Sequence, residues 1–72
     1  MSSSKTWAEI RVGDVLMDES TGRIFKIQTM LVEHGWFTRI TVHAVNVMTQ
    51  KITTWVVNAD SVPRDFTWIG GG

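Results

Sequence analysis

The side chains that could take part in chemistry are few and scattered. Only two histidines occur, His34 and His43, whereas a catalytic zinc site needs three protein ligands. The absence of cysteine removes both a thiolate metal site and a disulfide framework. Ser20 and Ser61 fall in turn-forming segments, and neither has a histidine close in sequence to activate it. We therefore predict no enzymatic activity, no metal site and no cofactor.

Charge and composition favour a protein that works by binding. Seven basic and seven acidic side chains give a formal net charge of +0, which argues against coating a phosphate backbone by bulk electrostatics. The charge is unevenly spread, because residues 21–57 contain four basic side chains but only one acidic side chain, Glu33. This cationic centre suits either a nucleic acid or an acidic protein surface.

Length and terminal composition predict the organisation of the chain. A chain of 72 residues forms one domain, and a domain of this size buries only about 60% of its unfolded surface. We expect a disordered N-terminus over residues 1–5, a single small β-barrel domain over residues 6–69 and a flexible glycine tail over residues 70–72. No apolar stretch approaches the length of a membrane span, so we expect a cytoplasmic protein with no membrane partner.

Turn-forming residues divide the chain into short elements. Residues 6–9 fit a capping box, which predicts a short helical turn whose Trp7 and Ile10 cover one end of the core. Residues 15–17 and 65–69 have the composition of short strands. Residues 23–57 are rich in Val, Ile, Thr, Phe and Trp, with polar breaks at 34–35 and 49–50, which predicts a three-stranded meander. Residues 58–63 predict a 3₁₀-like turn before the last strand.

This order of elements resembles that of the SH3-like small barrel. The resemblance implies an all-β fold in which five short strands close into a barrel, with a helical turn at the N-terminus. A strongly bent antiparallel sheet with the N-terminal turn packed on it is the alternative.

A two-residue turn at positions 34–35 sets the expected register of the first hairpin. It pairs Ile27 with Val42 and Phe25 with Ala44, and a similar turn at 49–50 sets Ala44 opposite Trp55. The small side chain of Ala44 then lies between two large aromatic rings, as close packing requires. The predicted core face also contains Thr29, Leu31, Ile40 and Val57.

The opposite face of this sheet divides into a cationic middle, an apolar patch and an aromatic hairpin tip. The candidate partner-binding residues are Lys26, Met30, Trp36, Phe37, Arg39, Thr41 and His43. The candidate homodimer patch consists of Ile24, Val45, Val47, Ile52 and Val56. The favoured alternative for this patch is that the bent sheet folds it under the N-terminal turn or the last strand, and the remaining alternative is that a foreign partner binds there. For the aromatic tip, capping of one end of the barrel is the favoured alternative to partner binding, because exposed-looking aromatic residues in a small domain more often complete its core.

Two functions are compatible with these residues. The favoured interpretation is a small non-enzymatic binding module, a protein–protein interaction or inhibitor protein that acts on a larger protein. In size and composition the chain resembles accessory proteins of phages and mobile elements, many of which act on a host protein. The alternative is a small barrel that binds nucleic acid, with basic side chains on phosphates and aromatic side chains stacked on bases, and that gains contacts as a homodimer.

Overall fold

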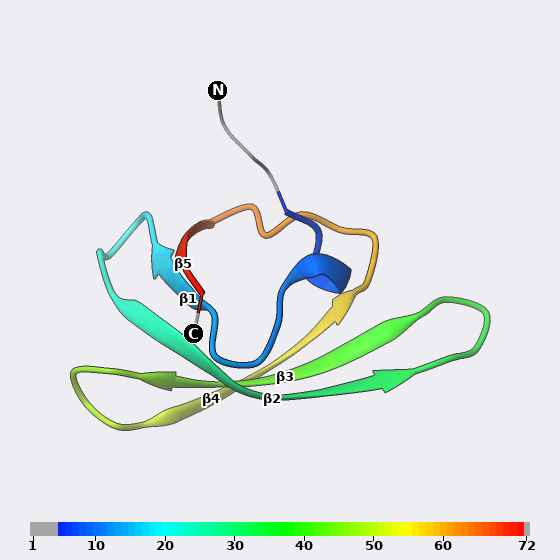
Figure 1. Ribbon diagram of the computed structural model, residues 1–72, viewed down its shortest axis with the longest axis horizontal. Helices are drawn as coiled ribbons and strands as arrows, with labels where there is room; N and C mark the ends of the chain where they lie inside the picture. Colours follow the sequence, from blue (N-terminus) through cyan, green and yellow to red (C-terminus); the bar gives the residue numbers. More distant parts are fainter. Residues whose placement is uncertain (1–4, 72) are drawn as a thin grey trace.

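Five antiparallel strands form one sheet in the computed structural model of this chain, which describes residues 5–71 (Figure 1). The order of the strands in the sheet is β4-β3-β2-β1-β5. A 3₁₀ turn, η1, precedes them, so the prediction of an all-β fold with a short N-terminal helical turn is confirmed. The elements are η1 (Trp7–Glu9), β1 (Val15–Asp18), β2 (Ile24–Glu33), β3 (Arg39–Asn46), β4 (Ile52–Asn58) and β5 (Phe66–Gly70).

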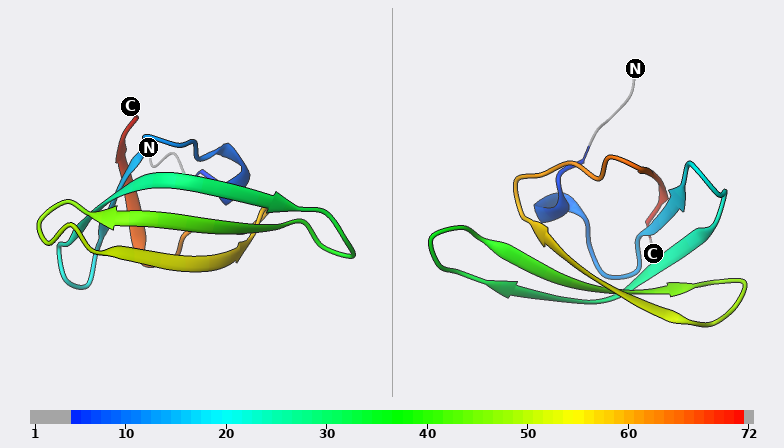
Figure 2. Two further views of the ribbon diagram at one scale, coloured as in Figure 1. Left: turned by 90° about the horizontal axis from the view of Figure 1, so that it is seen from below. Right: turned by 180° about the vertical axis from the view of Figure 1, so that it is seen from behind.

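The sheet is strongly bent, and the 3₁₀ turn lies on its concave side (Figures 1 and 2). Within residues 5–71, β4 and β5 are the two edges of the sheet and do not pair with each other, so the strands do not close into a barrel. Gly70 is the last residue of β5. Lys5 and Gly71, which were also assigned to the terminal segments, are described, whereas residues 1–4 and 72 lie outside the described part of the chain.

The core fills the concave side of the sheet. Leu16, Ile27 and Val42 are fully buried there, and Trp7 and Ile10 from the N-terminal turn pack against them. The turn is held by Glu9, whose Oε1 accepts hydrogen bonds from the Thr6 N–H and hydroxyl, each at 3.1 Å. Both bonds favour the charged carboxylate and lower the pKa of Glu9, and the bond from the Thr6 N–H has the larger effect.

Backbone contacts position the segment between the 3₁₀ turn and β1. Gly13, at a positive φ of 97°, donates its N–H to the Ile27 carbonyl at 2.9 Å. The Ile27 N–H in turn donates to the Asp14 carbonyl, also at 2.9 Å. The buried Asp14 carboxylate accepts the Arg11 N–H at 2.9 Å and closes this turn. The segment is therefore bonded to the middle of β2.

The register of β2 and β3 differs from the prediction. Ile27 lies opposite Ala44 and Thr29 lies opposite His43, so Gln28 is an extra residue that forms a β-bulge. The bulge directly follows Ile27, the residue bonded to positions 13 and 14, and a bulge bends the strand that contains it. The connecting loop contains five residues, 34–38, instead of two, because the last pair of the hairpin is Glu33 with Arg39.

Because of the bulge, residues 29–33 of β2 lie on the opposite faces of the sheet from those predicted. Met30, expected on the outer face, lies opposite the buried Val42 and packs against the core. Leu31, expected in the core, is 62% exposed on the outer face, where Thr29 also lies. The predictions for Met30 and Leu31 were wrong because the predicted register ran without a break and so contained no bulge at Gln28.

Residues 25–27 of β2, which precede the bulge, lie on their predicted faces. The register there is shifted by two residues, which restores the same side of a strand, so Phe25 and Ala44 are both buried. The register of β3 with β4 is shifted by two as well, with Trp55 opposite Val42. Trp55 still packs on the core, with its ring centroid 5.3 Å from that of Phe25 and 4.8 Å from that of Phe66.

Candidate functional site

The β2–β3 hairpin projects beyond the rest of the molecule (Figure 1, green). At its tip, defined as residues 34–38, the Trp36 side chain is 100% exposed and the Phe37 side chain is 74% exposed. A shallow hollow of about 260 Å³ is lined by residues of the tip together with Glu33, the last residue of β2, and Arg39, the first residue of β3. Neither ring caps an end of the core, so that alternative is wrong. Two adjacent aromatic side chains are instead left in water, an arrangement typical of surfaces that bind.

An apolar groove lies next to the tip, on the concave side of the hairpin. It has a volume of about 440 Å³ and separates the N-terminal 3₁₀ turn from the outer half of the hairpin. Met30 and Val32 reach this groove only because of the bulge at Gln28. Its lining residues are Trp7, Ala8, Ile10, Arg11, Val12, Met30, Val32, His34, Thr38, Ile40 and Ala59.

Sequence reasoning missed this groove. A continuous register directs Val32 to the opposite face, and nothing in the local sequence around Gln28 predicts the extra residue. His34 lines both the groove and the hollow at the tip, so the two adjoin at this residue. An apolar side chain of a partner placed in the groove would therefore lie close to Trp36 and Phe37.

The outer, convex face of the sheet consists of cross-strand rows. One row is polar: Thr29, His43 and Thr54, with the Thr54 hydroxyl 3.0 Å from His43 Nδ1. The next row joins Leu31 and Val56 on either side of Thr41. These two apolar side chains are both 62% exposed, so this face mixes polar and apolar rows along the strands.

The predicted cationic middle is dispersed on this face. Lys26 lies opposite Val45, whereas Arg39 lies six residues away along β3, about 20 Å at the rise of a strand. Arg39 also lies directly opposite Glu33, an acidic residue. The structure therefore brings together Thr41 and His43 but separates the two basic side chains by most of the length of the strand.

The candidate homodimer patch is also divided. Ile52 lies opposite Val45, and the Val47 N–H donates a hydrogen bond to the Ile24 carbonyl at 3.0 Å. These four residues therefore lie near one end of the sheet. Val56 lies four residues beyond Ile52 on β4 and belongs instead to the row of Leu31. Ile24 and Val45 are half-buried, and no terminal segment among the described residues pairs with β3 or β4.

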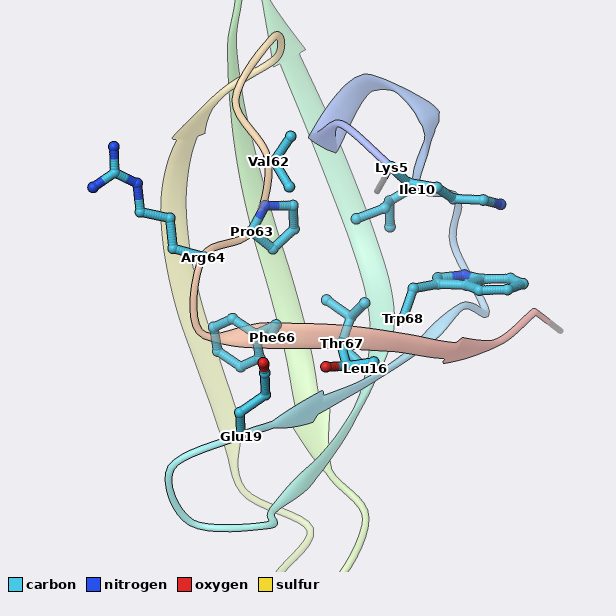
Figure 3. A pocket seen from close by; sticks show the side chains of 10 residues that line it. All are labelled: Lys5, Ile10, Leu16, Glu19, Val62, Pro63, Arg64, Phe66, Thr67 and Trp68. Atoms are coloured by element: carbon cyan, nitrogen blue, oxygen red, sulfur yellow. The ribbon is translucent and has the colours of Figure 1, made fainter. Parts of the chain in front are cut away.

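A second hollow, of about 440 Å³, lies between β5 and the segment that leads into it (Figure 3). The Trp68 ring forms one wall, and Lys5 Nζ lies 4.1 Å from its centroid, within cation–π distance. The Trp68 Nε1 atom is buried and has no hydrogen-bond partner within residues 5–71. The lining residues are Lys5, Ile10, Leu16, Glu19, Val62, Pro63, Arg64, Phe66, Thr67 and Trp68.

The groups that could support metal chemistry do not converge in the part of the chain that the structure describes. His34 lies at the tip and His43 in the middle of β3. No three His, Asp or Glu side chains among those residues are placed to hold a metal ion. No helix in the same part of the chain is long and apolar enough to cross a membrane.

Comparison of the chain with protein-family models, with curated proteins and with solved structures finds no match.

Proposed function

We propose that this protein is a small binding module, without catalytic activity, that docks on a larger protein through the tip of its β2–β3 hairpin. The observation that supports this function is the complete exposure of Trp36 beside the 74% exposed Phe37. Tryptophan is enriched among the residues that dominate binding energy, because its large ring buries much apolar area when a partner covers it. The apolar groove beside the tip extends the same surface.

A protein partner fits this surface better than a nucleic acid does. The chain has no net charge, and Arg39, the basic residue next to the tip, lies opposite the acidic Glu33. The groove wall is formed mainly by aliphatic and aromatic side chains, such as Met30 and Val32, which suit a partner's apolar side chain. Nucleic-acid binding through Lys26, Arg39 and the tip stays a prediction.

The finer features of the proposal concern fold type and context. We propose an SH3-like small barrel, supported by five short strands in the order β4-β3-β2-β1-β5 and a long, bent β2. Small size and the lack of cysteine support a cytoplasmic accessory protein of a phage or mobile element that acts on a host protein.

Photo-crosslinking from the tip tests the proposed function. A photoreactive phenylalanine analogue replaces Trp36, and a matched control carries it at Met48, which is 82% exposed in the β3–β4 turn. We expect the tip probe, but not the control probe, to join one defined protein in host lysate. Equal labelling from both positions, or labelling that nuclease treatment removes, would contradict a protein partner at the tip.

Alanine variants then measure the contribution of the tip to binding. Against the crosslinked protein, Trp36→Ala should weaken binding by about 30-fold or more, the equivalent of a hot-spot loss of about 2 kcal/mol. Met48→Ala should leave the affinity unchanged. Both variants should unfold at the temperature of the wild-type protein, because both side chains are exposed.

A further inference from the structure

Strand β4 is an edge strand that lacks the usual protection against pairing. Proteins blunt free edges with charged side chains, prolines, bulges or short strands. Residues Ile52–Asn58 contain no charged residue and no proline, and their register with β3 is unbroken over seven residues. The other edge, β5, has only five residues, and its pairing with β1 is irregular.

The free edge of β4 has a regular set of available backbone groups. Hydrogen bonds from the Asn46 N–H to the Lys51 carbonyl and from the Ala59 N–H to the Thr38 carbonyl, 2.9 and 3.0 Å long, frame the ladder with β3. Because bonded pairs alternate along an antiparallel ladder, the odd-numbered residues of β4 bond to β3. The N–H and C=O groups of residues 52, 54 and 56 therefore point to the free edge.

Space is open beside this edge. A cleft of about 420 Å³ separates residues 54–57 from residues 62–66, the segment that leads into β5. Within the described range of residues 5–71, no strand pairs with β4 on this side. Figure 2 shows β4 (yellow) as the outermost strand of the three-stranded part of the sheet.

We propose that β4 pairs in antiparallel orientation with β4 of a second copy, about a twofold axis at Thr54. In this register Ile52 of each copy lies opposite Val56 of the other, and the two Thr54 residues lie opposite each other. All three outward-facing residues then exchange backbone bonds, about six in total. Apolar pairs at both ends and a threonine pair in the centre are favourable cross-strand contacts.

A second copy suits this edge because the strand is complementary to itself. A twofold interface must place the same residues on both sides, and residues 52, 54 and 56 meet that condition with no like charges opposed. Ile52 and Val56 are 58% and 62% exposed, so pairing removes apolar surface from water. This surface is separate from the hairpin tip, which a β4 dimer leaves free on both copies.

Charge reversal at the centre of the proposed interface tests this dimer. Light scattering after size exclusion, over a concentration series at low ionic strength, should give twice the 8.1 kDa chain mass for the wild-type protein. Thr54→Lys and Thr54→Glu each place like charges opposite one another and should weaken dimerisation by about tenfold or more. An equimolar mixture of the two should recover the dimer, because unlike charges then meet. Met48→Lys and Met48→Glu, exposed and off the edge, should change nothing.

A single cysteine provides a second measurement that does not depend on these charges. The chain has no cysteine of its own, and the Cα atoms of a bonded antiparallel pair lie about 5.5 Å apart, within disulfide range. Under mild oxidation Thr54→Cys should form a covalent dimer much faster than Met48→Cys.

Four results would each overturn the proposal. The first is a wild-type protein that stays a monomer throughout the concentration series. The second is a dimer that both charge variants leave intact, since its interface would lie elsewhere. The third is equal crosslinking of the two cysteine variants, and the fourth is no recovery in the mixture, since in either case Thr54 would not lie on the twofold axis.

Discussion

Truncating Met30 and Leu31 separately to alanine tests the bulge at Gln28, on which the groove and the hairpin tip depend. The two residues are neighbours in sequence and similar in size, and the bulge places them on opposite faces of β2. Met30 packs on the core, whereas Leu31 is 62% exposed. A register without the bulge gives the opposite prediction for each residue.

The magnitudes follow from burial. Truncating a fully buried methionine to alanine costs about 2–5 kcal/mol, and Met30 is only half-buried, so Met30→Ala should cost about 1–2 kcal/mol. Most of the Leu31 side chain stays in water, so Leu31→Ala should change stability by less than about 0.5 kcal/mol. For a domain of this size, 1 kcal/mol lowers the melting temperature by about 4–8 °C. We therefore expect Met30→Ala to lower it by about 4–16 °C.

Thermal unfolding followed by circular dichroism measures both variants against the wild-type protein. Urea unfolding of the same samples checks that the slope of the transition is unchanged, so that the comparison is one of stability alone. A larger loss for Leu31→Ala than for Met30→Ala would refute the bulge and restore the continuous register. Equal losses would refute the assignment of the two side chains to opposite faces.

Further predictions concern the core, a turn and the basic residues. Trp55→Ala should cost about 3–5 kcal/mol, because its ring packs on three other aromatic rings; a variant as stable as the wild-type protein in urea would contradict that packing. The Ser20 hydroxyl and N–H donate hydrogen bonds to the Asp18 carboxylate and lower its pKa. The charged carboxylate therefore stabilises the fold at pH values above the pKa of Asp18 in the unfolded chain. This stabilisation is lost as the pH falls through the lower pKa of Asp18 in the folded protein. Ser20→Ala should raise the pKa of Asp18, as followed by carboxyl-carbon NMR, and an unchanged titration would show that the backbone bond suffices. The double variant Lys26→Glu with Arg39→Glu should abolish binding of a short DNA in a salt titration if nucleic acid is the ligand, with stability within about 0.5 kcal/mol. Binding that survives this double change would exclude those two side chains as the phosphate contacts.

The all-β fold class and much of the core are predictable from the amino-acid sequence alone. Alternating apolar residues and polar breaks predicted five strands, because burial on one face of a strand leaves a period of two. Phe25, Ile27 and Ala44 fall on the buried face as predicted. A register shift of two residues does not change the face of a strand, so these assignments do not depend on the length of the turn. For Trp36 and Phe37 the sequence offered both partner binding and capping of the core, favoured capping, and did not predict their exposure.

The position of the bend in the hairpin and the identity of the exposed side chains depend on long-range contacts, so local sequence patterns do not predict them. The bulge at Gln28 follows the residue whose backbone bonds positions 13 and 14, far away in sequence, so no local pattern around β2 contains it. The exposure of Trp36 depends on how far the hairpin extends past the N-terminal turn. The free edge of β4 exists because β4 and β5 do not meet. Each of these features is set by contacts between segments distant in the chain, and the chain's own periodicity is insensitive to such contacts.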